Sequence, residues 1–134
     1  LYAVIVTPSS LKKKGITFFT DSSFNQQVGF MKHKKNKVIL PHLHNKVYRK
    51  LSTTTEVIYI LDGSLRIDFY NKKKNYLFSK LVKKNSLLIL VNGGHGFKVS
   101  SDIQMIEIKQ GPYIQSKDKE KFLPINEKNI KIKK

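Results

Sequence analysis

Apolar and polar positions alternate in short runs along most of the chain. Eleven runs are rich in β-branched and aromatic residues, and turn-forming residues separate them about every 8–12 positions. We predict strands over residues 2–6, 16–20, 27–33, 37–42, 46–52, 56–61, 64–70, 76–82, 87–91, 96–100 and 103–109. No long segment shows the helical period, and only residues 117–122 favour a short helical turn. The pattern is typical of an all-β sandwich or barrel.

Turn residues indicate where the chain reverses. Asp62-Gly63 lies between two strand-like runs, and this pair favours a tight type I′ turn, so residues 56–70 are predicted to form a hairpin. Further reversals are expected at residues 71–75 and 83–86.

Some of the predicted strands are apolar on both faces, notably residues 56–61 and 87–91. Burial on both sides fits a closed barrel whose outer face meets something further, such as a second subunit. The apolar run at residues 2–6 has no obvious partner in a minimal barrel and would cover a sheet edge of another subunit. We therefore expect a homodimer.

The chain has 134 residues, enough for one domain, which we assign to residues 1–116 with a basic C-terminal tail at 117–134. Beyond Pro124 the tail is rich in Asn and Lys, and we expect it to be mobile or loosely docked. Cysteine is absent, which excludes disulfides, thiolate zinc sites and cysteine nucleophiles. The longest apolar run is too short to span a membrane, and residues 1–6 lack the features of a signal peptide. These points lead us to expect a cytoplasmic protein with no membrane partner.

The net charge of +17 raises the question of a polyanionic partner. Of the 26 basic residues all but Arg49 and Arg66 are lysine, and most lie in turns and the tail. Base and phosphate readers favour arginine because its guanidinium binds bidentately. We therefore expect no specific nucleic-acid partner, only weak, salt-sensitive binding, and a preference for small anionic ligands.

Three of the four histidines form a pattern that suits a metal. His42 and His44 are two positions apart, so on a strand both imidazoles point to one face. Glu56 opens a strong strand, and His95 lies in the glycine-rich run Gly93–Gly96 directly after an apolar strand. Three imidazoles and one carboxylate suit one Fe, Mn, Ni or Zn ion per chain. His33 lies among lysines and is expected to be solvated.

These residues resemble the cupin superfamily, whose first motif is G-x5-H-x-H-x3-4-E-x6-G and whose second is G-x5-P-x-G-x2-H-x3-N. Here Asn36 replaces the first glycine, and the Glu56-x6-Gly63 spacing holds, but eleven residues separate His44 from Glu56. In the second motif Asn85 replaces the first glycine, Val91-Asn92-Gly93 replaces Pro-x-Gly, His95 comes one residue early and Val99 replaces the asparagine.

The resemblance implies an all-β cupin-like β-barrel, a double-stranded β-helix or jelly roll, with His42, His44, Glu56 and His95 as ligands. It does not choose a reaction, because this fold hosts many. We expect a small metal-binding cupin acting on a small anionic or carbohydrate ligand. A metal-free sugar-nucleotide isomerase or epimerase with a histidine base, and a non-catalytic binding or sensing module, remain alternatives.

Three further residues are candidates for catalysis. Arg49 would clamp a carboxylate or phosphate. Glu107 shares a strand face with Met105, and a position inside the barrel would suit it to proton transfer, whereas a salt bridge on the outside is the alternative. Tyr59 would donate a hydrogen bond to a ligand or pack in the structure.

Overall fold

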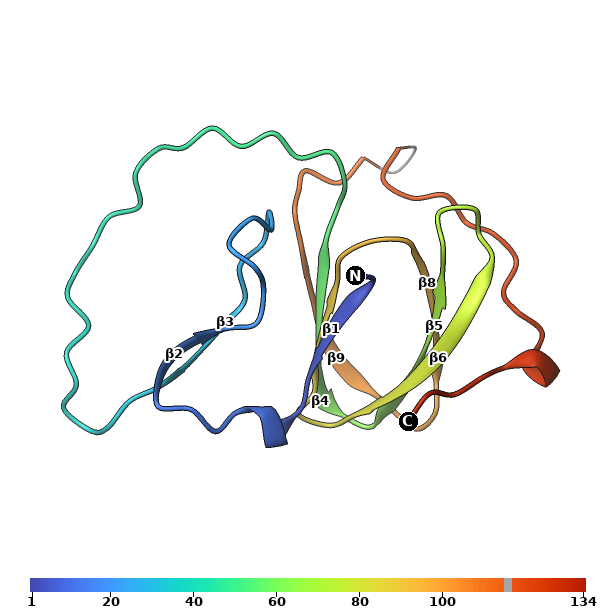
Figure 1. Ribbon diagram of the computed structural model, residues 1–134, viewed down its shortest axis with the longest axis horizontal. Coiled ribbons are helices and arrows are strands. Elements are labelled where there is room, and N and C mark those ends of the chain that lie inside the picture. Colours follow the sequence, from blue (N-terminus) through green and yellow to red (C-terminus); the bar gives the residue numbers. More distant parts are fainter. Residues whose placement is uncertain (115–116) are drawn as a thin grey trace.

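The computed structural model describes residues 1–114 and 117–134 (Figure 1). In this part of the chain it is all-β, with two 3-10 helices, η1 (Pro8–Ser10) and η2 (Glu127–Asn129). The strands are β1 (Ala3–Val6), β2 (Gly15–Phe18), β3 (Gly29–Lys32), β4 (Glu56–Asp62), β5 (Ser64–Tyr70), β6 (Tyr76–Lys83), β7 (Leu87–Leu90), β8 (Gly94–Val99) and β9 (Gln104–Lys109). The all-β prediction is confirmed, and nine of the eleven predicted strands are present within a few residues of their expected bounds.

Two antiparallel sheets form the body of the molecule. One has the order β1-β7-β4-β9 and the other β6-β5-β8. The connections β4–β5, β6–β7 and β8–β9 each pass from one sheet to the other, so they place β4 over β5, β7 over β6 and β9 over β8. The result is a two-layer sandwich, and within residues 1–114 and 117–134 no hydrogen-bonded ring of strands closes it into a barrel.

The expected hairpin at residues 56–70 was wrong in its pairing. β4 and β5 belong to different sheets and do not pair, so Gly63 turns a corner between layers. Gly63 has a φ of +83°, while Asp62 continues β4, so the turn is not of type I′. A Cβ at Gly63 would lie 1.9 Å from the carbonyl oxygen of Asp102, so the corner needs glycine for space as well as for conformation.

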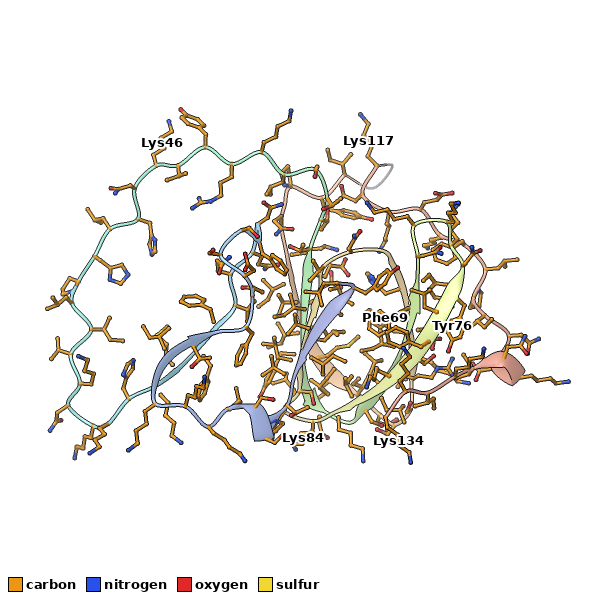
Figure 2. The ribbon with its side chains drawn as sticks, in the orientation of Figure 1. Lys46, Phe69, Tyr76, Lys84, Lys117 and Lys134 are labelled. Carbon is orange, nitrogen blue, oxygen red and sulfur yellow. The ribbon has the colours of Figure 1, made fainter. Side chains whose placement is uncertain are left out.

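The core lies between the two sheets. Its buried side chains come from one face of β4, β5, β6 and β7, and they are Ile58, Ile60, Leu65, Ile67, Phe69, Val82, Leu88 and Leu90. Figure 2 shows Phe69 in this space, between the layers. The alternation along β4 and β5 that predicted the strands is therefore the alternation between this core and the outer faces.

Part of the outer face of the first sheet, at β4 and β7, is also buried by the chain itself, whereas Ile106 and Ile108 of β9 on the same face are exposed. Ile89 and Val57 point away from the core and are almost fully buried. Residues 23–26 line a cavity together with Ile89, and Gln26 accepts a hydrogen bond from the hydroxyl of Thr55. The prediction that β4 and β7 are apolar on both faces is confirmed. The residues that cover their outer face here belong to the chain's own N-terminal part. The run at residues 2–6 is likewise partnered within the chain, since β1 pairs with β7.

Residues 33–54 form an extended arm, which we call the arm below. All of these residues are described, and none of them belongs to a strand, so the strands predicted over 37–42 and 46–52 are absent. The arm follows the β2–β3 hairpin and runs as a wide loop outside the sandwich (Figure 1). It carries seven exposed large apolar side chains: Val38, Ile39, Leu40, Leu43, Val47, Tyr48 and Leu51.

The C-terminal tail is docked. Its residues pair with the free edge of β6, where the amide of Ser79 donates to the carbonyl of Lys131 and the amide of Lys133 donates to the carbonyl of Ser79. Residues 117–122, expected to form a helical turn, contain no helix, and the only helical turn of the tail is η2. The excess of Asn and Lys predicted a mobile or loosely docked tail. The tail is docked because it pairs with backbone groups at the edge of β6, and composition does not reveal this pairing.

Candidate functional site

Glu56 and His95 meet at one end of the sandwich. Nε2 of His95 lies 3.0 Å from Oε2 of Glu56, and both side chains are largely shielded from solvent. His95 is paired across the strands with Phe69, and Glu56 with Leu90, so both project from the core faces of their sheets. Two ligands predicted from separate motifs are therefore brought into contact.

A tight glycine turn positions His95. Gly93 has a φ of +79°, and a Cβ there would lie 2.5 Å from the carbonyl oxygen of Tyr70. Gly94 follows, where a Cβ would approach the ring of Phe122 from the tail. Glycine lets β8 begin directly beside β5, which carries the imidazole of His95 inward toward Glu56.

The electrostatics of the pair favour an ionised carboxylate. The hydrogen bond to His95 holds the pKa of Glu56 below its ordinary value, and the positive charges of His95, Lys109 and Lys119 act in the same direction, while burial opposes them. A carboxylate that is ionised at neutral pH beside an imidazole nitrogen is a suitable pair of donors for a divalent transition metal.

A cavity of about 300 Å³ opens at this pair. Besides Glu56 and His95, it is lined by residues of four segments: Thr53, Thr54, Asn71, Lys72, Lys74, Leu90, Val91, Asn92, Gly93, Gly94, Glu120 and Phe122. Lys74 is ion-paired with Glu120 of the tail. The cavity therefore combines a donor pair with amide and ammonium groups, which suits a small polar or anionic ligand.

His42 and His44 lie elsewhere, on the exposed arm. Their rings are 5.3 Å apart between centroids, and Nδ1 of His42 lies 2.9 Å from the carbonyl oxygen of Leu40. Among the residues that the structure describes, no three His, Cys, Asp or Glu side chains come close enough to hold one ion. The structure thus separates the four predicted ligands into two pairs, His42 with His44 and Glu56 with His95.

The three catalytic candidates are also separated. Glu107 faces the core side of its sheet, opposite Ile58, but stays partly exposed and forms an ion pair with Lys109 at 2.8 Å. Arg49 lies on the arm and is exposed. Tyr59 projects from the other face of β4, away from Glu56, and its hydroxyl donates to Asn85. His33 is exposed, as expected.

Sequence reasoning did not select Lys72, Lys74 and Asn92 as lining residues. Lys72 and Lys74 belong to the turn between β5 and β6, and Asn92 belongs to the turn that precedes β8. Both turns lie at the same end of the sandwich as Glu56. This position follows from the pairing of the strands, which the sequence alone does not give.

Comparisons of the chain with protein-family models, with curated proteins and with solved structures found no significant match. Over the described residues, no helix has the length and apolar character needed to cross a membrane.

Proposed function

We propose that this protein is a small metal-binding cupin, which holds one divalent transition metal at Glu56 and His95, with His42 and His44 as the remaining ligands. The observation that carries the proposal is the 3.0 Å contact between Glu56 and His95. The two residues come from different motifs of the resemblance, and the fold brings them together at a cavity.

The arrangement of the strands supports the same proposal. The order β7-β4-β9 facing β6-β5-β8, with antiparallel pairs and connections that cross between sheets, is compatible with a double-sheet jelly roll. In this arrangement Glu56 opens β4 and His95 lies at the start of β8, so the ligand pair is held by rigid elements rather than by loops.

The donor set fits a transition metal. A carboxylate oxygen and an imidazole nitrogen suit Fe, Mn, Ni and Zn, and two protein ligands alone leave most of the coordination sphere to be filled. His42 and His44, whose rings already lie together, would supply two more nitrogen donors. When bound, the ion would supply Lewis acidity at the mouth of the cavity.

The cavity favours a small anionic ligand. Lys72 brings positive charge, Asn71 and Asn92 bring amide groups for hydrogen bonds, and the charge of Lys74 is already paired with Glu120. Glu107 lies on the core face of β9 but is exposed and ion-paired with Lys109, and neither Glu107 nor Arg49 is among the described lining residues, so we assign no role at the cavity to either of them.

A metal-free isomerase or epimerase acting on a nucleotide-linked sugar is the second candidate. The observation that favours it is the same contact, because a carboxylate that orients an imidazole is the arrangement of a general base. The lysines of the cavity would then hold the diphosphate.

Elemental analysis separates the two candidates. We expect protein prepared without chelator or affinity-tag nickel to contain close to one transition metal per chain, and His95→Ala to remove it. His33→Ala, which changes an exposed histidine outside the site, is the matched control and should keep the metal. A metal content near zero after reconstitution with Fe, Mn, Zn and Ni, together with a rise in melting temperature on adding a sugar nucleotide, would favour the isomerase instead.

A further inference from the structure

One side of the sandwich is open. β8 pairs only with β5 and β9 only with β4 in the described part of the chain, so each has a free edge, and β9 lies over β8. Phe97 and Val99 share the core face of β8, opposite the buried Ile67 and Leu65, yet they are 37% and 53% exposed. Met105 of β9 is similarly exposed on the core face. Interior-facing apolar residues are therefore uncovered along this side.

The arm has the complementary properties. Its residues 37–42 and 46–52 have the sequence pattern of strands but pair with no other described segment of the chain, and Leu43 and Tyr48 are 94% and 87% exposed. A strand-like segment and an unpaired sheet edge satisfy each other's backbone groups when they meet. Between residues 33 and 51 the arm contains six Lys and Arg residues and no acidic residue, so its backbone and apolar side chains, rather than charge pairing within the arm, are what it offers to a partner.

The arm of a chain is directed away from that chain's own open side. At its start it follows β3, which is paired in the β2–β3 hairpin. At its end Thr55 is buried, where its amide donates to Oε1 of Gln110 and its hydroxyl donates to Gln26. Figure 1 shows the arm beyond β2 and β3, with the sheet containing β4 between it and β8, and in Figure 2 Lys46 lies on the outer rim of the arm.

We propose that two copies of this chain exchange arms, so that residues 37–52 of each copy pair with the β8 and β9 edges of the other. The exchange is reciprocal and closed, because each copy offers one arm and one open side. It covers Phe97, Val99 and Met105, and it carries the His42–His44 pair toward the partner's Glu56–His95 pair. This last consequence rests on the proposed function, whereas the exchange itself rests on the open edges.

Cysteine cross-linking tests the exchange directly, because the natural chain contains no cysteine. A Leu43→Cys chain and a Val99→Cys chain, carrying tags of different size, are co-expressed and treated with a short bis-maleimide. We expect a cross-linked product that contains both tags, since the cysteines lie on different chains. Leu123→Cys, which places an exposed cysteine on the tail, replaces Val99→Cys in the matched control and should give little product.

Two results would overturn the proposal. In one, the double variant Leu43→Cys/Val99→Cys cross-links within a single chain while the two single variants give no mixed product, which means that the arm folds back on its own body. In the other, neither preparation cross-links, or the natural chain sediments as a monomer at micromolar concentration.

Replacing apolar residues of the arm, as in Leu40→Asn/Leu43→Asn, should weaken dimerisation at least about tenfold. Phe18→Asn, which changes an exposed apolar residue on β2, should not.

Metal content provides a second readout, which rests on the proposed function. One chain carries His42→Ala/His44→Ala and the other carries His95→Ala, and the mixed dimer is isolated through two tags. With exchanged arms it has one intact site and should hold one ion per dimer, while either variant alone holds none. If cross-linking succeeds and the natural protein binds no metal, the proposed function fails and the exchange stands. If metal binds the natural protein but the mixed dimer stays empty, the exchange fails.

Discussion

The imidazole of His95 and the carboxylate of Glu56 come from facing sheets, with Nε2 and Oε2 3.0 Å apart. Their contact joins β8 to β4 at one end of the sandwich. The glycine turn before β8, the β5–β6 turn and the tail converge at the same end. The contact is thus a structural tie across the open sandwich and a pair of potential ligands. The structural role can be measured apart from metal binding, because the contact persists without metal and its contribution to stability depends on pH.

The contribution of Glu56 to stability should depend on pH in a defined direction. Its pKa lies below the ordinary value of 4.5 because of the hydrogen bond to His95, so it stabilises the fold fully above that value and loses this effect as the pH falls. In metal-free protein at pH 7 we expect Glu56→Gln to lower the free energy of unfolding by about 1 kcal/mol. Urea unfolding at pH 7, 5 and 3 should show the difference shrinking toward zero at the lowest pH. A difference that is constant with pH would contradict this assignment.

Gly93 is expected to tolerate no side chain. Gly93→Ala would force an alanine into a positive φ and would place its Cβ 2.5 Å from the carbonyl oxygen of Tyr70. Both effects destabilise the turn, and the substitution should displace His95. Gly15→Ala is the matched control, since Gly15 has a φ of +87° but nothing within 4 Å of the added Cβ. We expect about 1 kcal/mol of destabilisation for the control and at least twice that for Gly93→Ala, measured by thermal unfolding. Equal effects would show that the close approach to Tyr70 is unimportant.

The sequence allowed the strands of the sandwich to be predicted, because each has one face against a core. The runs at 56–61, 64–70 and 103–109 correspond to β4, β5 and β9 within a residue or two. The same reasoning failed at 37–42 and 46–52, since β-propensity needs a partner strand to be realised, and these residues find none among residues 1–114 and 117–134. It also failed at Asp62-Gly63, because the same dipeptide serves a hairpin or a corner between sheets, and the choice depends on distant pairing.

The candidate site could be predicted only in part for a similar reason. Glu56 and His95 were selected from two motifs and do meet, because the motifs fix positions on β4 and β8, which lie in facing sheets and bring both residues to the same end of the sandwich. His42 and His44 were placed beside them on the assumption that their segment is a strand of the same body. The lining residues Lys72 and Asn92 were missed because turns carry no periodicity from which a direction can be derived.

A buried ion cluster beneath the tail should be sensitive to loss of one partner. Asp68 is buried, accepts two hydrogen bonds from Arg66 and accepts another from the hydroxyl of Ser79. Asp68→Ala leaves Arg66 with half of its partners, and we expect a loss of about 3–5 kcal/mol in the free energy of unfolding. The control is Asp62→Ala, which removes an exposed ion pair with Lys84 and should change stability little. Urea denaturation measures both, and similar losses would contradict the distinction between buried and exposed pairs.

Docking of the tail should depend on Glu127. Its carboxylate oxygens lie 2.7 and 2.9 Å from two nitrogens of the Arg66 guanidinium, and Lys98 approaches to 3.0 Å. These contacts lower the pKa of Glu127 from 4.5 to about 2. A lowered pKa means that the stabilisation is complete above 4.5 and is lost as the pH falls toward 2. The tail should therefore detach from β6 over this acidic range.

Amide hydrogen exchange at Lys133 follows this step, because that amide donates to the carbonyl of Ser79 only when the tail is docked. At pH 6 we expect Glu127→Gln to expose the amide to exchange while the amides of β5 stay protected. Glu120→Gln is the matched control, because Glu120 also lies on the tail and pairs with an exposed lysine, Lys74, rather than with Arg66. It should leave the exchange at Lys133 unchanged. Equal exchange in both variants would mean that the backbone pairing with Ser79, and not the contact with Arg66, holds the tail.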